Sequence, residues 1–446
     1  MKFFGVTETC DLGALYMKLL AEGHEVRILV TEPMAQGTMA GIVDRVPDLE
    51  TGLTWVGAGG IVIFESVSEG FGERQDALRR RGFQVVGGSA YGDLLENDRA
   101  YGLGLLAELG FPEGHVWEFS DADLADEFLS QRPGRYVLKF SGSDHSSQDN
   151  YLGQSADGSD VRAVLAARKS CAYTFILMEF IEGVEMGIGA YFNGEDFLLP
   201  ACLDWEHKRF FAGDMGELTG EMGTVATFDR SRAFYEKTLA KLVPHLRGRG
   251  HVGYINLNTI VNEQGIWPLE FTSRFGYPGF AVLDPLQRTP WGELFQRMIG
   301  RTETTIEINP GFSVGIVLTT PPFPYSRKQI DEPVGLPLTF LEPTTEDAAN
   351  IHYGEVGMQR GTIVTSGLYG WTMVVTGTGN TIDAARDAAY ERAARIVIPN
   401  GRYRLDIGER LARGGFSILD KLGIFGSDIA KPVSPDVIAN SGVVGG

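Results

Sequence analysis

The first 95 residues alternate short apolar runs with helical stretches, and this alternation constrains the fold more than any other feature. Strands are predicted at residues 2–6, 25–31, 60–65 and 83–87, and helices at residues 12–23 and 71–81. A strand–helix–strand repeat at this spacing favours an open parallel sheet. Ligands of such sheets bind beyond the carboxyl ends of the strands, where residues 7–13 and 64–66 lie in this chain.

The remaining residues mix helices with longer β segments, which indicates an α/β protein that is α+β in parts. Helices are predicted at residues 97–109, 162–169, 230–246 and 381–395, and a hairpin at residues 252–261 and 266–271. Further strands are predicted at residues 136–140, 175–180, 187–192, 197–201, 313–319, 361–365 and 371–377. We expect a loosely packed tail at residues 413–446, with one short helix near residues 418–422.

Length and composition limit the classes of protein to which the chain can belong. Its 446 residues suggest two to four domains, and its 58 glycines suggest many turns and close backbone–ligand approaches. A net charge of −19 argues against general nucleic-acid binding. We expect no membrane span, because no run approaches 18 apolar residues, and no signal peptide. Three scattered cysteines favour a reducing cytoplasm.

Two segments are candidates for nucleotide contact. Lys139 lies near the end of an apolar strand and precedes a loop of small, polar residues, 141–150, an arrangement suited to a phosphate. A strand-end lysine in water is the commoner case when that feature stands alone. In residues 178–185, a bend presents backbone groups of Glu179 and Ile181 to an adenine edge, although a solvated acidic hairpin is an equally good interpretation.

Cations and oxygen donors occur together further along the chain. His207, Lys208 and Arg209 precede a glycine-rich stretch, residues 213–223, which suits an anionic ligand. A histidine such as His207 is, taken alone, more often a surface or core residue than a catalyst.

The predicted hairpin carries a candidate metal site. Asn258, Glu270 and Thr272 share one face, and oxygen ligands of these kinds suit Mg²⁺. Arg274 follows and offers a bidentate fork for a carboxylate or phosphate. The alternative is an ordinary polar hairpin face.

In this order, the segments resemble the ATP-grasp superfamily, and most closely the glycinamide ribonucleotide synthetase (phosphoribosylamine–glycine ligase) family. The resemblance runs from the first strand to about residue 412. Residues 179–185 resemble the hinge of the family, residues 207–209 its His-Lys-Arg, residues 218–223 its Asn-Thr-Gly-Gly-Met-Gly and residues 269–276 its Glu-Phe-Asn-x-Arg-Phe-Gly-Asp. Residues 315–317, 335–337 and 406–408 also match family segments.

The resemblance implies a fold and a reaction. The fold would comprise an acceptor-binding α/β domain (1–95), a two-lobed ATP-grasp region (96–310) with a mobile lid at about 112–185, and a smaller β-rich C-terminal domain (311–412). The reaction would use ATP and Mg²⁺, or Mn²⁺, to convert a small-molecule carboxylate into an acyl phosphate, which a small-molecule amine then attacks. Glycine is one candidate carboxylate. The implied setting is purine biosynthesis in the cytoplasm, by a monomer or dimer.

The resemblance also assigns roles to residues. It assigns catalytic roles to Lys139, Arg274, Lys208 and Arg209. It assigns nucleotide contacts to Arg99, Lys139, Glu179, Phe180, Ile181, Glu185 and His207. It assigns metal ligation to Glu270, Asn258 and Thr272. It assigns substrate contacts to Glu8, Asp11, Glu65, Thr219, Gly220 and Arg274.

Departures from the family pattern leave the amine acceptor open. Arg99 replaces a lysine, loop 141–150 has no lysine, and Thr272 replaces an asparagine ligand. Residues 8–13 replace the family's Gly-Gly-Arg-Glu-His-Ala, and residues 64–68 replace its Pro-Glu-Ala-Pro-Leu. Three hypotheses follow: a ligase of this family, the same chemistry with an acceptor other than phosphoribosylamine, and an inactive nucleotide-binding or scaffold protein.

Overall fold

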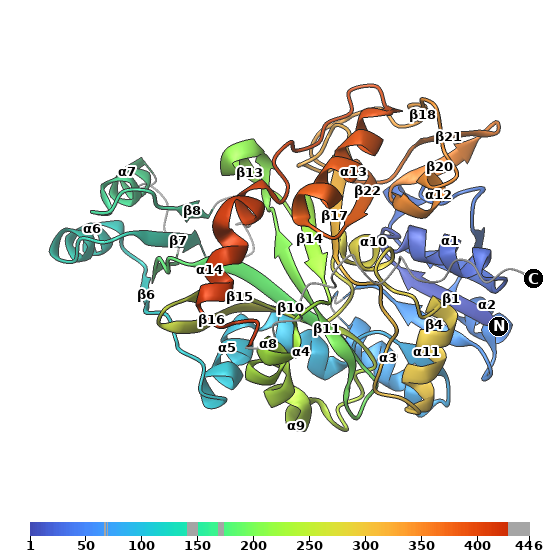
Figure 1. Cartoon of the computed structure of the whole chain (residues 1–446), viewed down its shortest axis with the longest axis horizontal. Helices are drawn as coiled ribbons and strands as arrows, with labels where there is room; N and C mark the ends of the chain where they lie inside the picture. Colours follow the sequence, from blue (N-terminus) through green and yellow to red (C-terminus); the bar gives the residue numbers. More distant parts are fainter. Residues whose placement is uncertain (67, 69, 141–149, 168–173, 427–446) are drawn as a thin grey trace, which may run out of the picture.

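The computed structural model describes residues 1–66, 68, 70–140, 150–167 and 174–426. The predicted N-terminal parallel sheet is present, with strand order β3-β2-β1-β4-β5 (Figure 1). Its strands are β1 (Lys2–Thr7), β2 (Glu25–Val30), β3 (Asp44–Arg45), β4 (Ile61–Phe64) and β5 (Gln84–Val86). They are joined through α1 (Gly13–Ala21), η1 (Pro33–Ala35), α2 (Leu49–Val56) and α3 (Phe71–Arg80).

The apolar sequence of β1 is explained by burial on both faces of this sheet. Phe3 belongs to the main core, whereas Phe4 belongs to a second core together with Leu53 and Leu78 of the covering helices. Successive strand residues point to opposite faces, so a strand covered on both sides requires a continuous apolar run.

The helix predicted at residues 97–109 is present as α5 (Arg99–Glu108), and a helix that was not predicted, α4 (Ala90–Asn97), comes directly before it. The chain leaves helical geometry at Asp98, whose carboxylate accepts a hydrogen bond of 2.9 Å from the Tyr101 amide. Asp98 thus starts α5 as an N-cap, and the break orients Arg99 at the beginning of the second helix.

A small lobe, residues 116–179, protrudes from the body of the molecule (Figure 1). Its antiparallel sheet has the order β6-β9-β7-β8, with strands β6 (Val116–Phe119), β7 (Tyr136–Phe140), β8 (Tyr151–Leu152) and β9 (Phe175–Glu179). Helices α6 (Ala122–Gln131) and α7 (Ser159–Ala167) complete a separate core that includes Leu129, Leu138 and Leu177. Most of the predicted loop 141–150 and the last residues of the predicted helix 162–169 lie outside the described residues.

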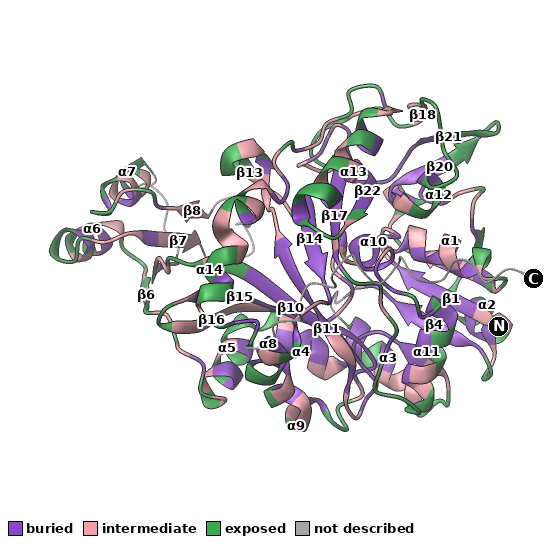
Figure 2. Ribbon diagram, viewed as in Figure 1, coloured by how far each residue is buried: buried purple, intermediate pink, exposed green. Residues whose placement is uncertain are grey.

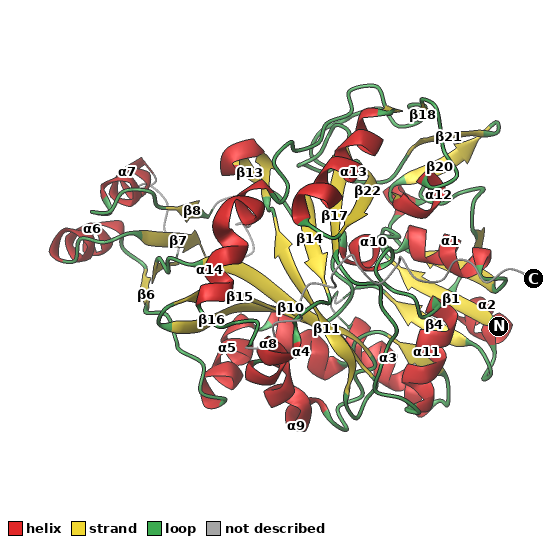
Figure 3. Cartoon of the chain, in the orientation of Figure 1, coloured by secondary structure: helices red, strands yellow, loops and turns green. Residues whose placement is uncertain are grey.

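The central sheet is antiparallel and has the order β16-β15-β10-β11-β14-β17-β22-β19 (Figure 3). Its strands are β10 (Val184–Phe192), β11 (Phe197–Glu206), β14 (Gly223–Thr227), β15 (Gly253–Asn262), β16 (Gly265–Thr272), β17 (Phe312–Thr319), β19 (Ile351–Tyr353) and β22 (Trp371–Gly379). The predicted hairpin is β15–β16. Because β14 pairs with β17, the sheet continues across the predicted boundary near residue 310.

Shorter elements surround this sheet. The described α-helices here are α8 (Arg232–Lys237), α9 (Val243–Leu246), α10 (Gly279–Leu283), α11 (Trp291–Gly300), α12 (Asp347–Asn350), α13 (Ile382–Ala394) and α14 (Phe416–Lys421). The described 3-10 helices are η3 (Ala212–Asp214) and η4 (Leu239–Leu242), and η5 (Leu411–Gly415) is a π-helix. Three ribbons pair β12 (Arg209–Phe211) with β13 (Met215–Leu218), β18 (Thr339–Phe340) with β23 (Ile396–Val397), and β20 (Val356–Gln359) with β21 (Thr362–Thr365). The helix predicted at residues 230–246 is interrupted at Thr238, where φ is −125° and ψ is −97°.

One main core joins the three parts of the chain (Figure 2). It contains Leu15 of the N-terminal domain, Trp291 of the central region and Ile316 beyond residue 310. Leu419 and Phe425 also belong to it, so the expectation of loose packing is wrong for residues 413–426. Residues 427–446 lie outside the described residues. None of the described helices has the length and apolar character needed to cross a membrane.

Candidate functional site

Three carboxylates converge on the ammonium group of Lys208. Lys208 Nζ lies 2.9 Å from Glu270 Oε1, 3.1 Å from Glu206 Oε2 and 3.7 Å from Glu185 Oε1. The carboxylates come from β16, β11 and β10, and Lys208 lies between β11 and β12. We call these four residues the Lys208 cluster.

The cluster keeps Lys208 charged. Burial of Lys208 opposes its charged form, but Glu206, Glu270 and Glu185 outweigh that effect and raise its pKa well above the ordinary value. Lys208 in turn lowers the pKa of Glu270. The cluster therefore holds a fixed pattern of charges across the central sheet.

Two more predicted cations surround Glu270. Arg99 Nη1 lies 3.6 Å from Glu270 Oε2, and Arg99 Nη2 donates a hydrogen bond of 2.9 Å to the Leu269 carbonyl. Burial, with the charges of Arg99 and Lys208, lowers the pKa of Lys139 to about 8, although Glu270 opposes the shift. The structure thus brings together cations from α5, β7 and the start of the β12–β13 ribbon, which are far apart in sequence.

Arg274 is held by a glutamate that sequence reasoning missed. Arg274 Nη2 lies 3.1 Å from Glu96 Oε1, and the Ser273 amide donates a hydrogen bond of 2.6 Å to Glu96 Oε2. Burial raises the pKa of Glu96, whereas Arg274 lowers it. Glu96 lies at the end of α4, and no sequence motif connects it with residue 274.

The predicted adenine-binding bend follows β9. Its Glu179 amide donates to the His115 carbonyl at 3.0 Å, and its Phe180 amide donates to the Arg135 carbonyl at 2.9 Å. The Arg135 guanidinium lies 3.5 Å from the centre of the Phe180 ring. These contacts fasten the bend to the small lobe and use two of its backbone donors, while Ile181 continues the chain toward β10.

His207 has a structural position, contrary to its predicted nucleotide contact. Its Nδ1 lies 3.2 Å from the Gly223 carbonyl, and its Nε2 accepts a hydrogen bond of 3.0 Å from the Gly408 amide. Burial and the charge of Arg404 lower its pKa to about 4, so the ring is neutral. Both ring nitrogens are engaged within the protein, which leaves none for a nucleotide.

Three other predicted residues make contacts within the protein instead of extending the cluster. Arg209 Nη1 donates a hydrogen bond of 2.8 Å to the Gly216 carbonyl and so stabilises the β12–β13 ribbon. The amide and the hydroxyl of Thr219 both donate to the Lys208 carbonyl at 2.8 Å. Gly220 is packed too closely for a side chain. Of these three residues, Thr219 fixes the backbone of Lys208, Arg209 stabilises the ribbon, and Gly220 lies against Trp371.

The predicted metal ligands fit a divalent cation only in part. Glu270 offers a carboxylate beside the cations, as Mg²⁺ requires. Asn258 does not fit, because its amide nitrogen donates to Glu185 at 2.9 Å and its oxygen accepts from the Thr259 amide at 2.9 Å. Thr272 faces Asn256 across the hairpin. Within the described residues, no group of three or more His, Cys, Asp or Glu side chains is arranged to hold a metal ion.

The N-terminal acids lie at the carboxyl ends of the parallel strands, as expected, but Glu65 faces inward. Its carboxylate accepts hydrogen bonds from Thr7 at 2.9 Å, from the Leu12 amide at 3.1 Å and from the Tyr16 hydroxyl. Burial raises its pKa to about 7. Glu65 therefore organises the loop after β1, and its predicted substrate contact is not supported.

Asp11 and Glu8 lie on the same loop with other neighbours. Asp11 Oδ1 accepts a hydrogen bond of 2.7 Å from the Thr9 hydroxyl, and Glu8 accepts a hydrogen bond from the Ser68 hydroxyl. Burial raises the pKa of Asp11, and Arg274 opposes the shift, so these two side chains interact electrostatically. The loop after β1 thus meets the site at Arg274.

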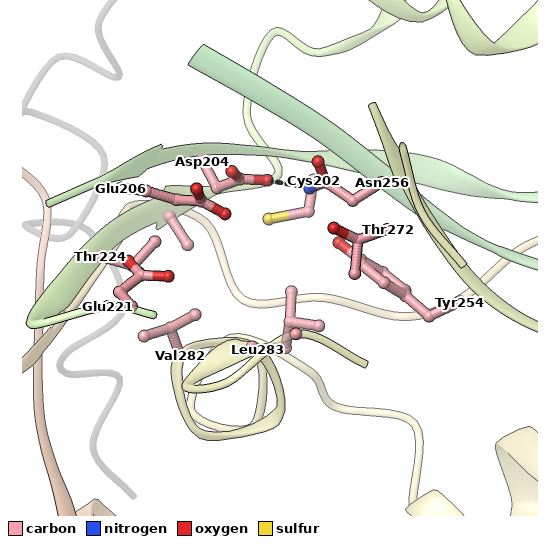
Figure 4. A pocket seen from close by; sticks show the side chains of 13 residues that line it. Cys202, Asp204, Glu206, Glu221, Thr224, Tyr254, Asn256, Thr272, Val282 and Leu283 are labelled. Atoms are coloured by element: carbon pink, nitrogen blue, oxygen red, sulfur yellow. Dashed lines mark hydrogen bonds between the residues drawn. The ribbon is translucent and has the colours of Figure 1, made fainter. Parts of the chain in front are cut away.

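An acidic cavity that sequence reasoning missed adjoins the Lys208 cluster (Figure 4). Its volume is about 40 Å³, and its lining residues are Cys202, Asp204, Glu206, Glu221, Thr224, Ala226, Tyr254, Asn256, Thr272, Gly276, Gly279, Val282 and Leu283. Burial and Glu206 raise the pKa of Asp204 to about 8 and that of Glu221 well above its ordinary value. Two signals were present in the sequence: Asp204 alternates with Glu206 on one strand, and Glu221 replaces a glycine of the family motif.

Comparison with known proteins agrees with the expected family. Residues 97–280 match the family described as phosphoribosylglycinamide synthetase, ATP-grasp (A) domain. Among curated proteins, the phosphoribosylamine–glycine ligase of Listeria monocytogenes is 25% identical over 351 residues, which cover 75% of this chain and 80% of that protein. The corresponding protein of Neisseria meningitidis is 24% identical over 364 residues, with coverages of 75% and 80%.

Solved structures show the same fold. The phosphoribosylamine–glycine ligase of Thermotoga maritima superposes with a TM-score of 0.66 at 21% identity, over 91% of this chain and 100% of that chain. The biotin carboxylase domain of Hydrogenobacter thermophilus 2-oxoglutarate carboxylase has a TM-score of 0.61 at 12% identity, with coverages of 95% and 98%. The expected ATP-grasp architecture is confirmed.

Proposed function

Because residues 97–280 form an ATP-grasp domain of the phosphoribosylglycinamide synthetase type, we propose that this chain is an ATP-dependent ligase that joins a small-molecule carboxylate to a small-molecule amine. The observation that carries the proposal is the convergence of Arg99, Lys139 and Lys208 on Glu270. Clustered cations beside a carboxylate suit the phosphates of a nucleotide.

The reaction would proceed in two steps. The substrate carboxylate attacks the γ-phosphorus of ATP, which releases ADP and forms an acyl phosphate. The amine then attacks the acyl carbon, so that the amide bond forms and inorganic phosphate leaves. Lys139 and Arg99 would contact the phosphates of ATP, and their charge would offset the charge that develops during transfer.

Other residues would hold the reactants. Arg274, held by Glu96, would bind the substrate carboxylate or its acyl phosphate. Glu270 would hold Mg²⁺, which supplies positive charge to the phosphates when bound; Mn²⁺ accepts the same oxygen ligands. We also propose that the small lobe is a lid over the nucleotide, since it has its own core and is joined to the body at the bend after β9.

A nucleotide-binding protein without catalysis is the second candidate. The orientation of Asn258, which turns its amide nitrogen toward Glu185 and its oxygen toward the backbone, favours this alternative. Thr272, a neutral hydroxyl, is also a weaker ligand than a carboxylate. Turnover measurements separate the two candidates.

The test is a coupled assay of ADP release that crosses amino acids, glycine included, with amines, phosphoribosylamine included. The ligase proposal predicts ADP release that requires ATP, a divalent cation, one carboxylate and one amine together. Nucleotide binding without ADP release for any pair would favour the second candidate. Lys139→Ala should abolish release, and Lys237→Ala, an exposed lysine on α8, is the matched control.

A further inference from the structure

The acidic cavity lies between the strands β11, β14 and β15 and the helix α10 (Figure 4). Asp204, Glu206 and Glu221 form one side of it, and Val282 and Leu283 of α10 form the floor. The cavity therefore has a charged wall and an apolar floor.

The protein supplies no cation to two acids of this wall. Glu206 pairs with Lys208, but Asp204 and Glu221 form no ion pair within the part of the chain that the structure describes. Asp204 is 7% exposed and Glu221 is 4% exposed. A buried carboxylate without a cation is unfavourable, and burial accordingly raises the pKa of both acids. A positively charged ligand in the cavity would favour their charged forms.

Asp204 supplies an independent indication. Its Oδ2 accepts a hydrogen bond of 2.6 Å from Asn256, whereas its buried Oδ1 has no hydrogen-bond partner among the described residues. The carboxylate lines the cavity, so the free oxygen is available to a donor placed there. Buried acceptors are ordinarily paired, and an unpaired one at a cavity marks a missing donor.

The size and chemistry of the cavity select an amine. A volume of about 40 Å³ accommodates an ammonium group with roughly one or two methylenes, given that a cavity needs roughly 10–15 Å³ of this kind of volume to hold one water. The apolar floor suits an alkyl stem. The acids that wall the cavity would repel a phosphate group, and Glu8 and Asp11 stand at the carboxyl end of β1, where a phosphorylated acceptor would need cations.

We propose that this cavity receives one protonated amino group of an unphosphorylated alkyl diamine, and that the second amino group, uncharged, is the acceptor of the ligase. The second amino group gives its proton to solvent as the amide bond forms. Asp204 and Glu221 accept hydrogen bonds from the ammonium group, and Val282 and Leu283 contact its stem. The inference rests on the proposed function, because it names the amine class of that reaction. Glu206 belongs both to the cavity and to the Lys208 cluster, which places the amine beside the nucleotide cations.

Binding is tested directly by calorimetry on the full chain, with 1,3-diaminopropane as the probe. Wild type should bind the probe, and Asp204→Asn and Glu221→Gln should weaken binding by roughly tenfold or more. Glu236→Gln, an exposed glutamate on α8, is the matched control and should bind as wild type does. Equal binding by all four proteins would overturn the inference.

Conservative variants separate recognition from damage to the fold. Glu221→Asp keeps the charge and should retain binding of the diamine, whereas Glu221→Gln removes the charge and should lose it. Both amide variants should unfold at the same temperature as wild type or higher, since each replaces a buried carboxyl group that has no cation by an uncharged amide of the same shape. Loss of binding in Glu221→Asp and Glu221→Gln alike would contradict a charge-based role.

Metal binding is the competing explanation. If Mg²⁺ alone binds wild type, displaces the diamine and loses affinity in Glu221→Gln, the cavity is a cation site and the inference fails.

Turnover measurements give a second test. Glu221→Gln should raise the KM for an alkyl diamine without changing the KM for ATP. The inference would also be overturned if wild type used phosphoribosylamine efficiently and Glu221→Gln left the KM for phosphoribosylamine unchanged. If no pair of carboxylate and amine gave ADP release, the ligase function would be rejected. The calorimetric measurements would still show which ligand binds in the cavity.

Discussion

At the residue scale, Lys208 and Lys139 show how neighbours determine the charge of a buried lysine. Both are removed from water, but Lys208 faces three carboxylates and keeps its proton. Lys139 faces Arg99 and Lys208 as well as Glu270, and its pKa falls to about 8. Of these two cations, Lys139 is therefore the one whose charge depends on pH near neutrality.

Nucleotide affinity should fall as the pH rises above about 8. The pKa of Lys139 in the free protein is about 8, below its ordinary value, so the ammonium group is lost through that pH, and an anionic nucleotide binds the charged form. Calorimetry at pH 7 and pH 9 should show weaker ATP binding at the higher pH, with proton uptake on binding. Lys139→Arg should remove both effects, and a persistent pH dependence in that variant would assign them to another group.

Loss of Glu270 should slow turnover strongly. Glu270 contacts Lys208 and Arg99, and a preorganised charged group of this kind is typically worth about 10²–10³ in rate. Glu270→Ala should lower kcat by about that factor in the ADP-release assay, and Glu236→Ala serves as the control. A reduction below about threefold would mean that Glu270 organises the cations without acting on the reaction.

At the element scale, the small lobe is stabilised separately from the rest of the chain. Leu129, Leu138 and Leu177 belong to its own core, and none of these residues belongs to the main core. Elements with their own core open and close with little effect on their surroundings. The separate core therefore supports the proposal that the small lobe is a lid.

Truncation in the core of the small lobe should have a local effect. Leu138 is fully buried in β7, and Leu→Ala at such a site costs about 2–5 kcal/mol. Leu138→Ala should increase amide hydrogen exchange in β6, β7 and β9 while the central sheet keeps its protection. Increased exchange in β10 and β15 as well would show that the lobe and the body unfold together.

At the scale of the whole molecule, one sheet holds together segments that the sequence pattern divides. β14 pairs with β17 from Gly223↔Ile316 to Ala226↔Ser313, and β17 pairs in turn with β22. The main core likewise contains residues from before and after position 310. The predicted division at residue 310 therefore does not separate two folding units.

A fragment of residues 1–310 should not fold independently. The fragment lacks β17, β22 and β19, so β14 would become a bare edge, and core residues such as Val225 and Val282 would lose their cover. The purified fragment should lack a cooperative thermal transition and should aggregate, as measured by circular dichroism and light scattering. A soluble fragment with a sharp transition would instead show that the C-terminal segment is a separate domain.

The elements with strong local patterns were predictable from sequence. The strand at residues 136–140, the β15–β16 hairpin and the parallel N-terminal sheet follow from apolar periodicity and turn residues. The helix α4 and the interruption at Thr238 were missed. Apolar residues continue on both sides of Thr238, so the local pattern did not indicate a break there. The buried segment after residue 413 was also missed, since its apolar residues are few and their partners are distant in sequence.

By itself, the sequence determined the fold class and the resemblance to the ATP-grasp superfamily, and it named Arg99, Lys139, Lys208 and Arg274 as candidate cations, because these depend on local patterns and motif order. Only the tertiary structure decided which polar residues face the site. His207 and Glu65 turn inward to satisfy backbone groups, while Glu96 and Asp204 meet partners from distant strands. The direction of a buried side chain depends on contacts with residues that are distant in sequence, and the local sequence pattern does not reveal those contacts.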